Sequence, residues 1–469
     1  VHVTNNLSPT VLTESYQYVD GFGRGIQNII SGESGYIKSD TRYDLVGNTS
    51  SLSLRYVSTS STFGYDAPSG LKTSFTHDPL GRTLSEVNTV GTVSFEYDGL
   101  TTAVTDQLNN TKELTTDTFG NLVEVVEFND GDQYTTSYTY DPVNNLTSIT
   151  DAEGNTRSMT YDKLSRRLTL TDLHTPSDTT YGIYTYTYDK MNLLSMTDPN
   201  GETISYTYDA LNRPLTENAS STPGTDWAFV YDTCGYGIGR LCSTTGLNGY
   251  QTTYEYGPQG FLSQEVKNIE GTNYQTTMSY DWAGNIITIT HPNGSHTDYR
   301  YNTQGLVDQI DHDDVRITRF DYGPHGNISR EHHENGITTR HFYDPNNMHR
   351  FKVKRSIKDG VDIQKLAYRY NAAGNINRII DTSAGTTAKT QQFYYDDLYR
   401  LTKTTVTNEV NGNDYTQEYS YSPIGNIESF DGIQYTYTDV GYNNPHAATA
   451  VGSTSLSYDN NGNMTNDGL

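Results

Sequence analysis

The sequence predicts an all-β protein, and three observations carry this prediction. Tyrosine supplies 40 residues, more than the 31 Lys and Arg together, in a chain that is only 33% hydrophobic. Tyr and Thr suit the half-buried surface of a pleated sheet, whereas Asn, Asp and Gly favour turns. Segments rich in the residues that long helices prefer, Ala, Leu, Glu and Lys, are few. A short motif built on Tyr-Asp recurs along the whole chain at a nearly fixed period.

The repeated motif is Tyr-Asp-x-x-Gly followed by Asn or Arg, with clear copies at 43–48, 280–285 and 458–463. The Asp can accept backbone N–H groups and begin a type I turn. The Gly then takes the left-handed conformation that closes a hairpin. The strand before the turn alternates, as in Tyr184, Tyr186 and Tyr188, so its tyrosines share one face.

A second turn often follows about ten residues later, as at 150–155, 198–201 and 291–294, so each repeat consists of strand, turn, strand, turn. About nineteen such units, of roughly 19–27 residues each, cover residues 1–469. We therefore predict one continuous domain over 1–469, a long antiparallel β-hairpin strip whose units are stabilised by their neighbours. We expect it to be part of a larger protein, because neither an initiator Met nor a signal peptide begins it and no cap follows the last repeat.

Charge and hydropathy exclude several classes. The net charge of −25 disfavours nucleic acid and anionic membranes as general partners. No run approaches 18 apolar residues, so we expect no membrane span. Disordered chains are poor in aromatic residues, whereas each tyrosine ring here can bury a large apolar area and leave its hydroxyl in water.

The two cysteines, Cys234 and Cys242, flank a Gly-rich segment. That spacing leaves two alternatives open: a disulfide across a hairpin, which would favour an exported protein, or two separate buried thiols. The pair lacks the second pair of ligands that a zinc site needs. Most Asp residues occupy a fixed turn position, so we expect no metal and no cofactor. No G-x-S-x-G, H-E-x-x-H or phosphate-binding Gly loop is present.

These motifs resemble the YD/RHS repeats of bacterial polymorphic toxins, of the encapsulating subunits of Tc toxins and of teneurins. Two stretches sharpen the resemblance toward the bacterial proteins: the Gly-Ile-Gly-Arg-Leu run at 237–241, and Asn444-Pro445-His446-Ala447 before the last motif. The resemblance implies a strip that spirals into a hollow shell around a C-terminal effector, in a secreted or cell-surface protein. The enclosed or fused effector would be its partner. The family's Asp- and Pro-rich core motif is absent, so its autoprotease activity is not carried over.

One window departs from the repeat. Residues 291–355 hold nine basic and nine acidic residues, so the remaining chain carries the whole net charge of −25. The window also holds eight of the twelve histidines: His291, His296, His312, His325, His332, His333, His341 and His349.

A hairpin centred on a two-residue turn, Asn335-Gly336, would organise this window. It would pair Glu331 with Arg340 and Arg330 with His341. Alternation then predicts two sets of side chains on opposite faces. One face would carry Arg330, His332, His341 and Tyr343, and the other Glu331, His333 and Arg340.

Two interpretations of the window follow. In the first, the histidines replace aromatic residues in a stacking row, and the chain is a structural shell or scaffold rather than an enzyme. In the second, the chain acts on carbohydrate, as a glycan-binding module or a polysaccharide lyase. A lyase would use Arg330, His332, His341 and Tyr343 as catalytic residues for β-elimination, and Arg319, His333 and Arg340 to bind an acidic ligand. Its partner would then be a polysaccharide or a cell-surface glycan.

Overall fold

The computed structural model describes residues 2–8, 11–32, 35–174, 182–221, 226–383, 388–408, 414–437 and 444–468. These residues form β-strands joined by short turns, with two 3₁₀ helices, η1 (Ser69–Leu71) and η2 (Leu247–Gly249). Within the described ranges, β1–β41 belong to one 41-stranded sheet and β42 and β43 to a two-stranded sheet. No helix in these ranges combines the length and apolar character needed to cross a bilayer. The predicted all-β strip is confirmed.

Most strands of the first half are joined to the next strand by a tight turn. They are β1 (His2–Ser8), β2 (Val11–Val19), β3 (Gly25–Gly32), β4 (Gly35–Tyr43), β5 (Thr49–Ser53), β6 (Tyr56–Ser58), β7 (Lys72–His77), β8 (Thr83–Asn88), β9 (Gly91–Asp98), β10 (Thr101–Thr105), β11 (Thr111–Thr116), β12 (Leu122–Asn129), β13 (Asp132–Tyr140), β14 (Leu146–Thr150), β15 (Thr156–Tyr161), β16 (Arg167–His174), β17 (Ile183–Tyr188), β18 (Leu193–Thr197), β19 (Thr203–Tyr208), β20 (Pro214–Ala219), β21 (Trp227–Tyr231) and β22 (Leu241–Gly246).

The strands of the second half continue the strip. They are β23 (Gln251–Tyr256), β24 (Leu262–Ile269), β25 (Thr272–Tyr280), β26 (Ile286–Thr290), β27 (His296–Tyr301), β28 (Val307–His312), β29 (Val315–Tyr322), β30 (Ile328–His333), β31 (Thr338–Asp344), β32 (Arg350–Lys358), β33 (Val361–Tyr370), β34 (Ile376–Asp381), β35 (Lys389–Tyr395), β36 (Leu401–Asn408), β37 (Tyr415–Tyr421), β38 (Ile427–Phe430), β39 (Ile433–Thr436), β40 (Ala450–Val451), β41 (Thr454–Ser455), β42 (Ser457–Tyr458) and β43 (Met464–Asn466).

The Asp of each motif organises its turn through its side chain. In the turn at 44–48, the Asp44 Oδ1 atom accepts the backbone N–H groups of Val46, Gly47 and Asn48 at 3.0, 2.7 and 2.8 Å. Gly47 takes the predicted left-handed conformation, with φ of 103°. A short side chain that accepts several backbone N–H groups fixes the chain reversal locally.

The structure also explains why Asn or Arg ends the motif. The second carboxylate oxygen of the Asp, Oδ2, accepts a hydrogen bond from the side chain four residues later. Asn145 donates to Asp141 at 2.8 Å, and the Arg166 Nε donates to Asp162 at 2.7 Å. These bonds, together with the backbone N–H groups of the same two residues, lower the pKa of both carboxyl groups.

The motif arginine also reaches the next repeat along the strip. The Arg24 guanidinium lies 4.2 Å from the centroid of the Tyr43 ring, and that of Arg213 lies 4.3 Å from the Tyr231 ring. A guanidinium over an aromatic face is attracted by the ring electrons. The same arginine therefore closes its own turn and contacts the following repeat.

In most repeats, the motif tyrosine ties the repeat to the one before it. Its hydroxyl donates to a backbone carbonyl just after the preceding turn, at 2.6–3.2 Å. The donor and acceptor pairs are Tyr43 and Gly25, Tyr97 and Thr83, Tyr140 and Leu122, Tyr161 and Leu146, Tyr188 and Arg167, Tyr208 and Leu193, Tyr256 and Leu241, Tyr280 and Leu262, Tyr301 and Ile286, Tyr322 and Val307, Tyr343 and Ile328, Tyr395 and Ile376, Tyr421 and Leu401, Tyr437 and Ile427, and Tyr458 and Ala448.

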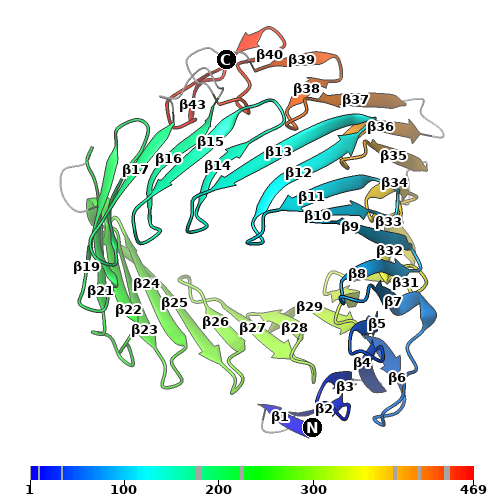
Figure 1. Ribbon diagram of the computed structural model, residues 1–469. Helices are drawn as coiled ribbons and strands as arrows, with labels where there is room; N and C mark the ends of the chain where they lie inside the picture. Colours follow the sequence, from blue (N-terminus) through cyan, green and yellow to red (C-terminus); the bar gives the residue numbers. More distant parts are fainter. Residues whose placement is uncertain are drawn as a thin grey trace.

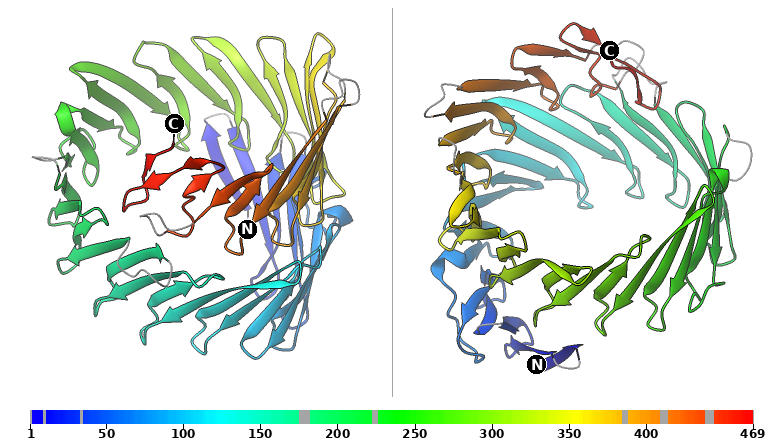
Figure 2. Two further views of the ribbon diagram at one scale, coloured as in Figure 1. Left: turned by 90° about the horizontal axis from the view of Figure 1, so that it is seen from above. Right: turned by 180° about the vertical axis from the view of Figure 1, so that it is seen from behind.

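The strip curves through more than one full turn, so that its later strands return beside its earlier ones (Figure 1). Figure 2 shows the same coiling from above and from behind. Hydrogen bonds join residues that are 259 to 293 positions apart in the chain. We call the stretch up to about residue 270 the first coil and the rest the second coil. The pairs so joined include Asp106 and Tyr399, Asn129 and Asp397, Asp172 and Asn444, and Asp198 and Asn461.

Removing one hydroxyl of the tyrosine ladder tests its contribution. We expect Tyr301→Phe to lower the free energy of unfolding by about 1 kcal/mol, because the Ile286 carbonyl loses its 2.7 Å partner while the ring still packs. Urea unfolding followed by circular dichroism measures the change. Tyr299→Phe is the matched control, since the Tyr299 hydroxyl makes no hydrogen bond within the described residues. Equal effects of the two substitutions would contradict a special role for the ladder.

The turn carboxylates predict a dependence of stability on pH. The pKa of Asp141 is lowered by its hydrogen bonds to Asn145, so the ionised form is favoured in the folded state. Its contribution is fully present above the ordinary Asp value of 3.8 and is lost as the pH falls through the lower folded value. We expect the melting-temperature difference between the wild type and Asp141→Asn to be constant above pH 5 and to shrink below pH 3.8. Asp132→Asn, at an exposed position outside the turn, should show no such shrinkage.

Candidate functional site

Two regions of the strip depart from the plain repeat: the seam between the coils and the His-rich window. The strip has two rows of turns, one along each side. We call the row of Tyr-Asp turns the Tyr-Asp edge and the other row the distal edge. At the seam, Tyr-Asp turns of the second coil contact distal-edge turns of the first coil, as the pair Tyr399 and Asp106 illustrates.

Tyr399 occupies the position that glycine holds in the repeated motif. Its φ is 64°, a left-handed conformation that costs energy in a side-chain-bearing residue, and its hydroxyl donates to the Asp106 carboxylate of the first coil. The neighbouring Asp397 accepts the backbone N–H of Asp130 at 3.1 Å. The sequence signal for this contact was the missing glycine, which our sequence analysis did not use.

Gly70 marks a second close approach at the seam. A Cβ atom at this position would lie 2.5 Å from the backbone carbonyl oxygen of Pro345 and 3.0 Å from the Cα of Asn346. Pro345 and Asn346 belong to a Tyr-Asp turn of the second coil. Any side chain at residue 70 would therefore push the two coils apart, which explains why glycine is required there.

A histidine pair lies in the same part of the seam. The rings of His325 and His349 are 3.5 Å apart between centroids, and the His349 ring stacks on Tyr343 at 5.0 Å. Burial, then His349 and Arg55, lower the pKa of His325 to about 4. Burial also lowers the pKa of His349. Arg55 belongs to the first coil, so protonation of the pair is disfavoured across the seam.

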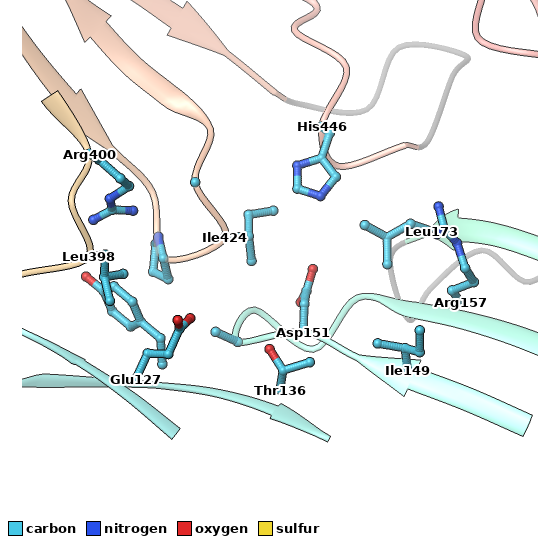
Figure 3. Close-up of a pocket in the computed structure, with 14 residues that line it drawn as sticks. Glu127, Thr136, Ile149, Asp151, Arg157, Leu173, Leu398, Arg400, Ile424 and His446 are labelled. Carbon is cyan, nitrogen blue, oxygen red and sulfur yellow. The ribbon is translucent and has the colours of Figure 1, made fainter. Parts of the chain in front are cut away.

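An open pocket of about 450 Å³ lies at the seam, shown in Figure 3. Ile149 and Leu173 of the first coil and Ile424 of the second supply apolar walls, while Asp151 and His446 point into the pocket from opposite sides (Figure 3). Its two arginines are already paired within their own coils: Arg157 with Asp172 and Arg400 with Asp396, each at 2.6 Å. The pocket is therefore a gap in the contact between the two coils. Its lining residues do not place a nucleophile beside a base.

The predicted hairpin register in the His-rich window is wrong by one residue. Arg330 faces Arg340, and His332 faces Thr338. The reason is a longer turn: the His333 N–H bonds to the Ile337 carbonyl, and the Gly336 N–H bonds to the His333 carbonyl. His333 takes the place that Asp has in most of the other turns of this kind. The matching spacing of His291-Pro-Asn-Gly294 was the signal that could have revealed this turn.

In the corrected register, the four predicted catalytic residues lie on two opposite faces of the sheet. Arg330 and His332 lie on one face beside Asp321, with N–O distances of 3.5 and 3.0 Å. Strand alternation puts His341 and Tyr343 on the opposite face. The His341 Nε2 lies 3.5 Å from Glu331, and the Tyr343 hydroxyl serves the tyrosine ladder.

The predicted ligand-binding residues are divided as well. Arg319 joins the Asp321 cluster, 3.2 Å from that carboxylate, whereas His333 contacts Glu331 at 3.3 Å on the other face. Arg340 lies between Arg330 and Arg355 in a row of three cross-strand arginines. Like charges directly opposite one another cost stability, which Asp321 and Asp362 partly offset.

The cysteines take the first of the two alternatives that the sequence left open. Cys234 and Cys242 form a disulfide, with Cα atoms 5.4 Å apart. The bridge closes the longer turn between β21 and β22, and Gly237 lies inside it, where a Cβ would approach the Cys234 sulfur to 2.3 Å.

Comparisons with known proteins agree with this architecture. The RHS Repeat family model matches residues 117–156, 140–180 and 192–223. None of the curated protein sequences matches the chain.

Solved structures extend the likeness to the whole strip. The crystal structure of TcdB2-TccC3-Cdc42 superposes with a TM-score of 0.79 at 15% identity, and that of TcdB2-TccC3-TEV with 0.80 at 14%. The Photorhabdus luminescens Tc holotoxin pore gives 0.80 at 16% identity. Each comparison covers 99% of this chain but 29% of the other, so the chain spans less than a third of the proteins whose fold it shares. Residues 117–180 and 192–223 thus match RHS repeats, and the chain as a whole shares the fold of these solved structures.

Proposed function

We propose that these residues form part of the wall of a hollow RHS-repeat shell, which encloses or presents an effector of a secreted bacterial toxin. The seam is the observation that carries the proposal. Turns of the second coil dock on turns of the first coil along the strip, so two successive coils make one continuous wall. The likeness of the fold to the TcdB2-TccC3 structures supports the toxin context.

The structural role of the repeated residues along the strip also supports a wall. The tyrosine ladder and the turn carboxylates are used for structure at nearly every repeat, and the same chemistry recurs without a single local centre. The His-rich window does not favour a lyase as a second candidate, because its proposed catalytic residues lie on opposite faces.

A substitution that separates the two coils at the seam tests whether the strip forms an enclosing wall. Gly70→Leu places a side chain where the Pro345 carbonyl lies, and we expect it to separate the coils without altering any repeat. Gly21→Leu is the matched control, because a Cβ there meets no atom within 4 Å. In the full-length gene product, segments outside the strip should resist protease in the wild type and in Gly21→Leu but be cleaved in Gly70→Leu. Equal cleavage in all three proteins would contradict an enclosing wall.

The shape of the isolated chain gives an independent readout. Small-angle X-ray scattering should report a hollow, compact particle for the wild type and a more extended one for Gly70→Leu. If both proteins scattered alike while protease protection was lost, the loss would not come from the seam.

The half-buried pair His325 and His349 predicts that acid weakens the seam. Because the pKa of His325 is lowered from 6.5 to about 4 in the folded state, the unfolded chain binds more protons between these values. The contribution of this residue is fully present above pH 6.5 and falls as the pH drops toward 4. We expect His325→Phe, which keeps a stacking ring, to flatten the fall in melting temperature over this window. His77→Phe, in the first coil and away from the pair, should leave the slope unchanged.

A further inference from the structure

The two-residue turn between β28 and β29 differs in one residue from four of the other two-residue turns. Those four turns place an acidic residue and then Gly in the left-handed conformation: Asp130-Gly131, Glu270-Gly271, Asp359-Gly360 and Asp431-Gly432. Here the residues are Asp313 and Asp314, with φ of 47° and 62°. A side chain at the second position costs energy that glycine would avoid.

The extra carboxylate points toward an imidazole. The Asp314 side chain is 91% exposed, and its Oδ1 lies 3.6 Å from the His296 Nε2. The Asp298 Oδ2 lies 3.4 Å from the same nitrogen. One ligand atom from each of His296, Asp298 and Asp314 can be chosen so that all three lie within 4.8 Å of one another, and no other such group occurs in the described ranges.

From this geometry we propose that His296, Asp298 and Asp314 bind a divalent transition-metal ion, with Zn²⁺ as the best-matched ion. Tetrahedral Zn²⁺ with bonds of about 2.0–2.1 Å requires ligand atoms roughly 3.3 Å apart, close to the two distances observed here. One imidazole and two carboxylates suit a borderline ion better than Mg²⁺ or Ca²⁺, which prefer oxygen alone. The exposed side of the site leaves room for a water molecule as the fourth ligand.

Residues behind the ligands hold them in orientations that suit a metal. The Asp313 Oδ1 lies 3.4 Å from the His296 Nδ1 and accepts the His296 backbone N–H at 2.8 Å. A carboxylate on the second imidazole nitrogen leaves Nε2 free to bind a metal. The Thr288 hydroxyl donates to the Asp298 Oδ1 at 2.7 Å, which turns Oδ2 toward His296. Three further charged or titratable groups adjoin this set. Asp311 lies directly opposite Asp298 in the strand pair and contacts Arg300 at 3.2 Å, and His312 lies 3.8 Å from the far oxygen of Asp313.

The site would join three neighbouring elements: β26 through Thr288, β27 through His296 and Asp298, and the β28–β29 turn through Asp314 (Figure 1). Turn formation accounts for most Asp residues of the sequence. Asp313 follows that rule, whereas Asp314 occupies a position where turn formation favours glycine. This inference goes beyond the wall function and does not depend on it.

The substitution Asp314→Gly separates metal binding from folding, because glycine is the residue that the other turns use. The metal-free variant should melt at a higher temperature than the wild type, since the backbone strain is relieved. Calorimetric titration of the chelator-treated chain with Zn²⁺ should give one saturable site in the wild type, with a rise in melting temperature. In Asp314→Gly and in His296→Gln the affinity should fall by at least tenfold. Thr288→Val should weaken binding by about 10–100-fold through the loss of orientation.

Asp359→Asn is the matched control, because it removes a carboxylate from another two-residue turn of the same acidic chain. Its Zn²⁺ affinity should equal that of the wild type. Two results would overturn the proposal. Absence of a saturable site in the wild type would mean that the three side chains only contact one another. Equal loss of affinity in Asp359→Asn and Asp314→Gly would mean diffuse binding to the net negative charge.

Discussion

The hydrogen bond from most motif tyrosines to the backbone carbonyl that follows the preceding turn holds this protein together. A sheet normally buries one face against a second layer of structure, but the described residues of this strip form a single layer (Figure 1). Their buried hydrophobic residues are few, and Tyr56, Ala67 and Leu71 form a small cluster. Tyrosine rings lie along the sheet instead, and most motif hydroxyls satisfy a backbone carbonyl.

The turn carboxylates make this arrangement repeatable. Each Asp satisfies the N–H groups of its own turn and holds the residue that ends the motif, so the next strand starts at a fixed place. The motif tyrosine of the following repeat is then placed to donate a hydrogen bond to its carbonyl partner. Because every step uses local contacts, the strip can continue for many hairpins with almost no conventional core, as in other repeat architectures.

The positions that depart from the repeat show where the strip makes specific contacts. Tyr399 and Asp314 both carry side chains where the backbone favours glycine, and both direct a polar group to a specific partner. Gly70 does the reverse and removes a side chain where the coils meet. Local rules that fail at particular positions commonly mark functional or strained sites. In this chain such positions lie at the seam and in the His-rich window.

The fold class, the position of most turns and the shared face of the tyrosines were all predictable from the sequence, because each depends on residues only a few positions apart. The register at His333 was not, because a histidine replaced the Asp that signals a four-residue turn, and a change of one residue in the loop moves every partner. The pairing of Cys234 with Cys242 required the actual backbone path. Contacts such as that of Tyr399 with Asp106 depend on twist and curvature summed over many hairpins, a quantity that no short stretch of sequence contains. The sequence therefore determined the strip, and only the tertiary structure decided where one coil meets the next.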